Sequence, residues 1–106
     1  MDYQNVRNAV NRAIEIVDRR IGSDEEGNGS CQLDSIEFDQ TFCDPDDEKD
    51  ETMAIVHFRW NDAETSKAGK PAGEKADIVL FEDDIVSSYW IAGMVYAKIL
   101  ATKDTL

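Results

Sequence analysis

The residues that could bind a metal lie early in the chain, in a run of oxygen-bearing side chains. Asp24, Glu26 and Asn28 hold positions one, three and five of a loop with calcium-binding spacing, and a glycine follows at position six. Position twelve is Ser35, although such a loop needs a glutamate there that binds through both oxygens. A second acidic run, at residues 44–51, has Lys49 at the glycine position. Spacing therefore predicts loose association with cations, no specific metal site and no bound cofactor.

A catalytic centre would need a nucleophile placed beside a base, and the sequence contains no recognisable pairing of that kind. His57 is the only histidine, and it falls in a predicted strand beside Arg59. Ser87 and Ser88 lie in an apolar helical stretch and match no nucleophile motif. Residues 69–73 contain two glycines and a lysine but lack the spacing of a phosphate-binding loop. We therefore expect that the chain is not an enzyme.

Cys31 and Cys43 are the only cysteines, and they are twelve positions apart in the sequence. If that segment is one extended strand, the two lie roughly 40 Å apart, which is too far for a disulfide. Neither belongs to a cluster with zinc-binding spacing. Reduced cysteines, and an N-terminus without the basic and apolar regions of a secretory signal, predict a cytoplasmic protein.

The elements that must position these residues begin with an amphipathic helix over residues 3–21. Its apolar side chains recur at helical spacing over an arc of roughly 160°. Asp2 is placed to cap the start of the helix, and Gly22 is placed to end it. This helix is expected to pack one face on a core and to hold its arginines in water.

Three strands are predicted next, and the first covers residues 32–42. Its side chains alternate, with Ile36, Phe38 and Phe42 expected on the core side. The alternation predicts an acidic outer face formed by Ser35, Glu37, Asp39 and Thr41.

The second and third strands are predicted at residues 52–60 and 77–81. The third is continuously apolar from Ile78, which predicts cover on both of its faces. Residues 44–51 and 61–76 are expected to be mobile loops. The core-facing side chains of the second strand are expected to be Ala54, Val56, Phe58 and Trp60.

The last predicted element is a helix that begins at a cap formed by Asp83 or Asp84 and runs to about Thr102. The apolar stretch at residues 85–101 has 17 residues. A helix needs about 20 apolar residues to span a membrane, so this one is expected to be buried in a protein that does not contact membrane.

Most of the circumference of this last helix is apolar, and Ile91 and Val95 are expected in the narrow remaining wedge. A helix that is apolar nearly all round is buried on more than one side. Gly93, Ala97 and Ala101 are spaced by four, so another helix can approach closely. That helix is either the first helix of the same chain or a second copy or other partner. The candidate dimer interface consists of Tyr89, Trp90, Gly93, Met94, Ala97 and Ala101.

The order of elements predicts an α+β fold over a single domain, residues 1–106, with a small antiparallel three-stranded sheet and both helices on one face. This order resembles that of double-stranded-RNA-binding domains. Those domains carry basic residues where the second helix begins, whereas this chain has Glu82, Asp83 and Asp84 there. An RNA backbone would be repelled, so the resemblance implies topology alone, and no direct nucleic-acid binding is expected.

The negative charge is concentrated in one segment. The net charge of the chain is −12, and residues 22–51 hold twelve acids against Lys49 alone. Such a field attracts basic surfaces. The candidate partner-binding acids are Asp24, Glu25, Glu26, Asp34, Glu37, Asp39, Asp44, Asp46, Asp47, Glu48, Asp50 and Glu51.

These features lead to three hypotheses of function. The first is a non-enzymatic inhibitor whose acidic face docks on a basic, nucleic-acid-binding surface of a target protein, as phage anti-defence proteins and DNA mimics of similar size and charge do. Toxin-immunity proteins share the same bulk properties. The second is a structural or assembly protein that dimerises through its C-terminal helix, and the third is a module that responds to metal.

Overall fold

The computed structural model describes residues 2–22, 30–43, 45–46, 51–61, 74–85 and 87–103. The described residues form an α+β fold in the predicted order. Its elements are α1 (Tyr3–Gly22), β1 (Ser30–Phe42), β2 (Glu51–Asn61), β3 (Glu74–Phe81), a short 3₁₀ turn η1 (Glu82–Asp84) and α3 (Ser88–Lys103).

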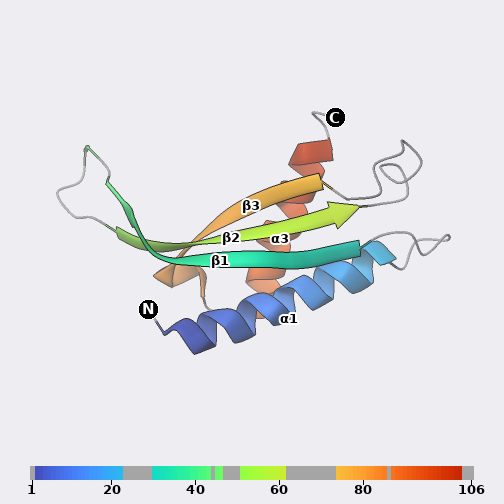
Figure 1. The fold of residues 1–106 in the computed structure, drawn as a ribbon, viewed down its shortest axis with the longest axis horizontal. Coiled ribbons are helices and arrows are strands. Elements are labelled where there is room, and N and C mark those ends of the chain that lie inside the picture. The colour runs from blue at the N-terminus through green and yellow to red at the C-terminus, as the bar shows by residue number, and fades with distance from the viewer. Residues whose placement is uncertain are drawn as a thin grey trace.

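The three strands form one antiparallel sheet in the order β1-β2-β3. Both helices pack on the same face of that sheet. In Figure 1, α1 runs beside β1, and α3 runs across the strands near β3. The core lies between the two layers, and its sheet side comes mainly from the predicted residues of β2, namely Ala54, Val56, Phe58 and Trp60.

The first helix forms as its sequence predicts. The backbone N–H groups of Gln4 and Asn5 donate to Oδ1 of Asp2, at 3.1 and 3.2 Å, so Asp2 is the N-cap. The helix extends to Gly22. Its buried side chains follow the expected helical spacing: Val6, Val10, Ala13, Ile14, Val17 and Ile21.

The second helix begins later than predicted, and a cap at Asp83 or Asp84 is wrong. Asp84 lies in η1, where its Oδ2 accepts a hydrogen bond of 2.9 Å from the backbone N–H of Phe81. The cap of α3 is Ser87, whose Oγ accepts from the backbone N–H of Trp90 at 3.1 Å. No helix in the described residues is long and apolar enough to cross a membrane.

Two irregularities interrupt the side-chain alternation of β1. Its register against β2 shifts between Leu33 and Ser35 and again between Glu37 and Gln40, so each shift inserts one extra residue. An extra residue moves every later side chain to the opposite face. The prediction that Phe42 faces the core is therefore wrong: Phe42 is 43% exposed and makes an edge contact with Phe81.

The third strand is covered on one face only, which contradicts the predicted cover on both. Ile78 and Leu80 are buried, whereas Val79 is exposed on the outer face, opposite Ile55 of β2. This strand begins at Glu74, so residues 74–76 belong to the sheet rather than to a loop. Glu51 and Asn61 belong to β2 rather than to the predicted mobile loops, and apart from residues 45–46 the rest of those loops lies outside the described residues.

Candidate functional site

The outward face of α3 is apolar, and we call it the α3 face. Tyr89 is 70% exposed, Trp90 56% and Leu100 45%. Between these large side chains lie Gly93, Ala97 and Ala101, which are also exposed. At 100° per residue, the six positions form one continuous arc of about 120° that contains no charged side chain. The members of the α3 face are Tyr89, Trp90, Gly93, Ala97, Leu100 and Ala101.

The opposite face of α3 is apolar too, and it fills the core. Ile91, Ala92, Val95 and Ile99 are buried. Sequence analysis placed Ile91 and Val95 in a polar wedge, and the structure shows instead that this wedge faces the sheet. An apolar helix has no polar side to mark which way it turns, so periodicity could not identify the buried face.

One alternative for the α3 face was contact with the first helix of the same chain. The structure shows that α1 does contact α3, but it does so from a different side. The guanidinium of Arg20 lies over the ring of Tyr96, 4.3 Å from its centroid, and Tyr96 is half-buried beside the arc. The α1 contact therefore leaves Tyr89, Trp90 and Leu100 in solvent.

Trp90 is exposed and forms one side-chain hydrogen bond within the chain. Its indole Nε1–H donates to Oδ1 of Asp84 at 3.3 Å. The same carboxylate holds the turn before the helix through the backbone N–H of Phe81. This hydrogen bond favours one position of the ring, which would lower the side-chain entropy lost if the ring were buried in a contact.

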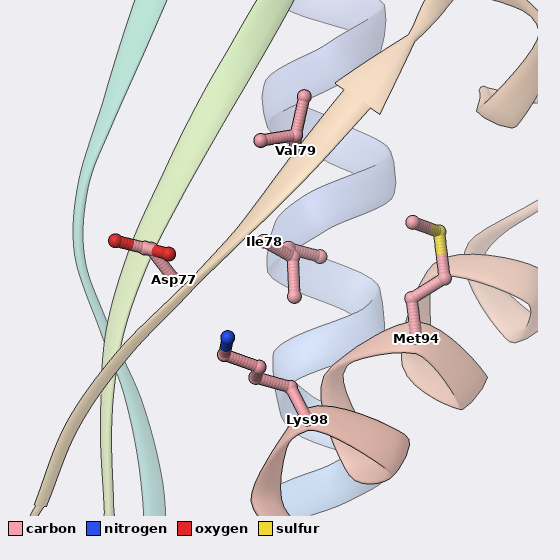
Figure 2. Close-up of a pocket in the computed structure, with 5 residues that line it drawn as sticks. All are labelled: Asp77, Ile78, Val79, Met94 and Lys98. Carbon is pink, nitrogen blue, oxygen red and sulfur yellow. The ribbon is translucent and has the colours of Figure 1, made fainter. Parts of the chain in front are cut away.

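A groove runs beside the α3 face, between α3 and the edge strand β3 (Figure 2). It has a volume of about 410 Å³ and is lined by Asp77, Ile78, Val79, Met94 and Lys98. Met94, the sixth residue of the predicted dimer interface, lies in this groove rather than on the exposed arc. The groove is open, and Ile78, Val79 and Met94 add apolar surface next to the α3 face, whereas Asp77 and Lys98 contribute charged groups.

The structure places two of the predicted partner-binding acids on the outer sheet face, each next to a basic side chain. Nε of Arg59 donates to Oδ2 of Asp34 at 3.0 Å. Nε2 of His57 lies 3.6 Å from Oε2 of Glu37. Asp77 of β3 approaches the same histidine from the other side, at 3.9 Å. Arg59 of the central strand thus offsets part of the acidic charge on this face.

The alternation predicted that Asp39 shares the outer face with Glu37. The structure shows that it does not. It sits in the second irregularity of β1 with φ of 57°, the left-handed region. Its carboxylate accepts a hydrogen bond from the hydroxyl of Tyr3 in α1, and Tyr3 also stacks on Phe38. Asp39 therefore helps to join β1 to the start of α1.

The other predicted acids divide into two groups. Asp46 is exposed in the connection between β1 and β2, and Glu51 is exposed at the start of β2. The rest lie outside the described residues: Asp24, Glu25, Glu26, Asp44, Asp47, Glu48 and Asp50.

The structure describes both cysteines and part of the other residues considered for chemistry. Neither cysteine is in a disulfide. Burial, and secondarily the charge of Asp18, raises the pKa of the Cys31 thiol to about 12, so this thiol stays protonated and unreactive at neutral pH. Among the described residues, no group of three or more histidine, cysteine or acidic side chains is arranged to hold a metal ion. Most of the calcium-like loop is not among them.

Sequence analysis did not pair the acids of β1 with Arg59 and His57, which lie beside them in the structure. Asp34 and Arg59 are 25 residues apart, and only the strand register brings them together. A check for opposite charges across the predicted hairpin could have found the pair, because cross-strand neighbours favour opposite charges.

The chain matches no protein-family model, no curated protein and no solved structure. Its function must therefore be argued from its own surface.

Proposed function

We propose that this chain is a non-enzymatic assembly protein that binds another protein surface through the α3 face. The observation that supports this proposal is the exposure of Tyr89, Trp90 and Leu100 on an arc without charge. Contiguous apolar surface on a folded protein usually marks a contact. Aromatic side chains at the centre of such surfaces contribute most of the binding energy.

The hydrogen-bonded indole of Trp90 also supports this role. An exposed tryptophan held by Asp84 resembles an anchor residue, which enters a partner without first losing rotamer freedom. The same ring has its polar atom satisfied within the chain, so its burial leaves no unpaired donor.

The test is the size of the protein in extracts of its own cells under native conditions. Wild type is expected to sediment as a complex, well above the 11.9 kDa of one chain. Trp90→Glu places a charge in the interface and is expected to sediment as the single chain. Asn11→Glu adds the same charge to an exposed position of α1 and should behave as wild type. Wild type that sediments as a single chain in the extract and after purification would contradict the proposal.

Electrostatic docking on a basic partner is a second candidate, and the exposed positions of Asp46 and Glu51 favour it. The two candidates respond to salt in opposite ways. Charge–charge contacts are screened as salt rises from about 50 mM to about 500 mM. Apolar contacts hold or strengthen under the same change. A complex that dissociates over this range would support docking of an inhibitor type, and a complex that persists would support the α3 face.

A further inference from the structure

We infer that the partner of the α3 face is a second copy of this chain, packed with its α3 antiparallel around a two-fold axis at the level of Val95. This inference rests on the proposed function, because it names the partner of the same surface. Four observations support it, and each concerns a different property of α3.

The first observation is a glycine that its own chain does not explain. Gly93 lies in the middle of α3, where glycine costs about 1 kcal/mol relative to alanine. A Cβ added to Gly93 would meet nothing within 4 Å. The monomer therefore has room for a side chain at this position. A second helix that approaches closely at Gly93 and Ala97 gives a reason for the small residue.

The second observation is that the α3 face is complementary to itself when two copies run antiparallel. Gly93 and Ala97 lie on either side of Val95 and meet at the centre. Given 1.5 Å and 100° per residue, Tyr89 of one copy then lies opposite Leu100 of the other. Trp90 likewise lies opposite Ala101, so the largest side chain of the α3 face meets a small one at each end of the interface. A parallel pair would place the two Trp90 rings together and leave the alanine end poorly packed.

The third observation concerns charge. The acids of η1, Glu82 to Asp84, directly precede α3. A parallel pair would bring the acidic turns of both copies together and align the two helix dipoles, which is unfavourable. An antiparallel pair separates the acidic turns. It also places the outer sheet faces, with their carboxylates, on the two far sides of the dimer.

The fourth observation is the amount of surface. The exposed parts of Tyr89, Trp90 and Leu100, with the small residues between them, offer roughly 500 Å² of apolar area per copy. Two copies would then bury about 1,000 Å², which reaches the lower limit for a specific interface. The dimer is therefore expected to exchange with monomer at low concentration.

The arrangement can be tested by sedimentation and disulfide trapping of the purified chain. Wild type is expected to sediment at twice 11.9 kDa at high concentration. Gly93→Leu fills the centre of the interface and is expected to be a folded monomer. Asn11→Leu adds the same side chain to an exposed position of α1 and should remain a dimer.

Disulfide trapping then reports whether the two α3 helices run parallel or antiparallel. All variants carry Cys43→Ser, because the exposed Cys43 could itself form a crosslink. In the antiparallel dimer the two Ala101 positions are about 18 Å apart along the helix axis, too far for a disulfide. Ala101→Cys alone should stay uncrosslinked, whereas Gly93→Cys mixed with Ala97→Cys should form a crosslinked dimer. Rapid crosslinking of Ala101→Cys would overturn the antiparallel arrangement. If the purified wild type stays monomeric, the proposal that the partner is a second copy is wrong. The proposal that the α3 face binds some protein would still hold if the native extract contains a complex that Trp90→Glu disrupts.

Discussion

The two helices of this protein pack on the same sheet face but differ in what they show to solvent. The outward side of α1 is polar and carries the ion pair between Arg12 and Glu15, whose Nη1 and Oε2 lie 3.3 Å apart. The outward side of α3 carries Tyr89 and Trp90. Both helices bury a similar apolar stripe. The difference is that α1 exposes a polar side, whereas α3 exposes a second apolar side that the described residues leave in solvent.

The core-facing sides of α1 and α3 should contribute equally to the free energy of unfolding. Substitutions on these sides are expected to have the largest effects on stability. Ile14 of α1 and Ile91 of α3 are both buried in the core. Replacement of either by alanine is expected to lower the free energy of unfolding by about 3 kcal/mol, because it removes buried methyl groups and leaves a cavity. Denaturant unfolding of each variant measures this loss. If Ile91→Ala cost much less than Ile14→Ala, α3 would be only loosely docked on the sheet.

A hydrogen bond gives α1 a further tie to the sheet. The backbone N–H of Cys31 in β1 donates to Oδ1 of Asp18 at 2.8 Å. Asp18→Ala leaves that buried donor unsatisfied, with an expected loss of about 2 kcal/mol in the free energy of unfolding. Asp18→Asn keeps the acceptor oxygen and is the matched control. Equal losses for the two variants would mean that the carboxylate charge, rather than the hydrogen bond, stabilises the contact.

The N-caps compare the starts of the two helices. Asp2 caps α1, and Ser87 caps α3. Alanine at either cap is expected to reduce the free energy of unfolding by about 1 kcal/mol, as thermal or denaturant melts would show. Replacement by glycine should cost less. No loss for Ser87→Ala would indicate that the turn held by Asp84 starts the helix unaided.

Substitutions on the solvent-facing sides of α1 and α3 are expected to change the folding stability least. At these positions the two helices should differ most clearly, because only α3 is expected to associate. In dilute monomer, Trp90→Ala and Arg12→Ala should each change the free energy of unfolding by about 0.5 kcal/mol or less. At high concentration only Trp90→Ala should weaken association, as sedimentation would measure. A large loss of folding stability in dilute Trp90→Ala would show that this ring supports the fold itself.

The sequence contained enough to predict the elements and much of the core. The spacing of Val6, Val10 and Val17 predicts the buried side of α1, and the alternation from Ala54 to Trp60 predicts the core side of β2; both are confirmed. The pattern of α1 is reliable because polar residues occupy its other face, and in β2 His57 and Arg59 mark the outer face. In α3 that contrast is missing, so the element was predictable but its orientation was not.

The candidate site was predictable only in part for a related reason. The composition of α3 indicates an interface, and five of its six predicted residues lie on the exposed arc. The acidic face was less well predicted, because the extra residues in β1 turn Asp39 toward α1. An inserted residue leaves no mark in the alternation before it, so the loss of register becomes visible only in the paired strands.

If two copies pack through α3, the exposed outer face of the sheet determines how the dimer could contact other molecules. Each dimer would then present two identical outer faces that point in opposite directions. A ligand with two matching sites could not reach both faces of one dimer without a long connection. Separate ligands could bind both, and the dimer would bridge them. Weak contacts at each outer face would then be strengthened in arrays, where binding at one face raises the effective concentration at its neighbours.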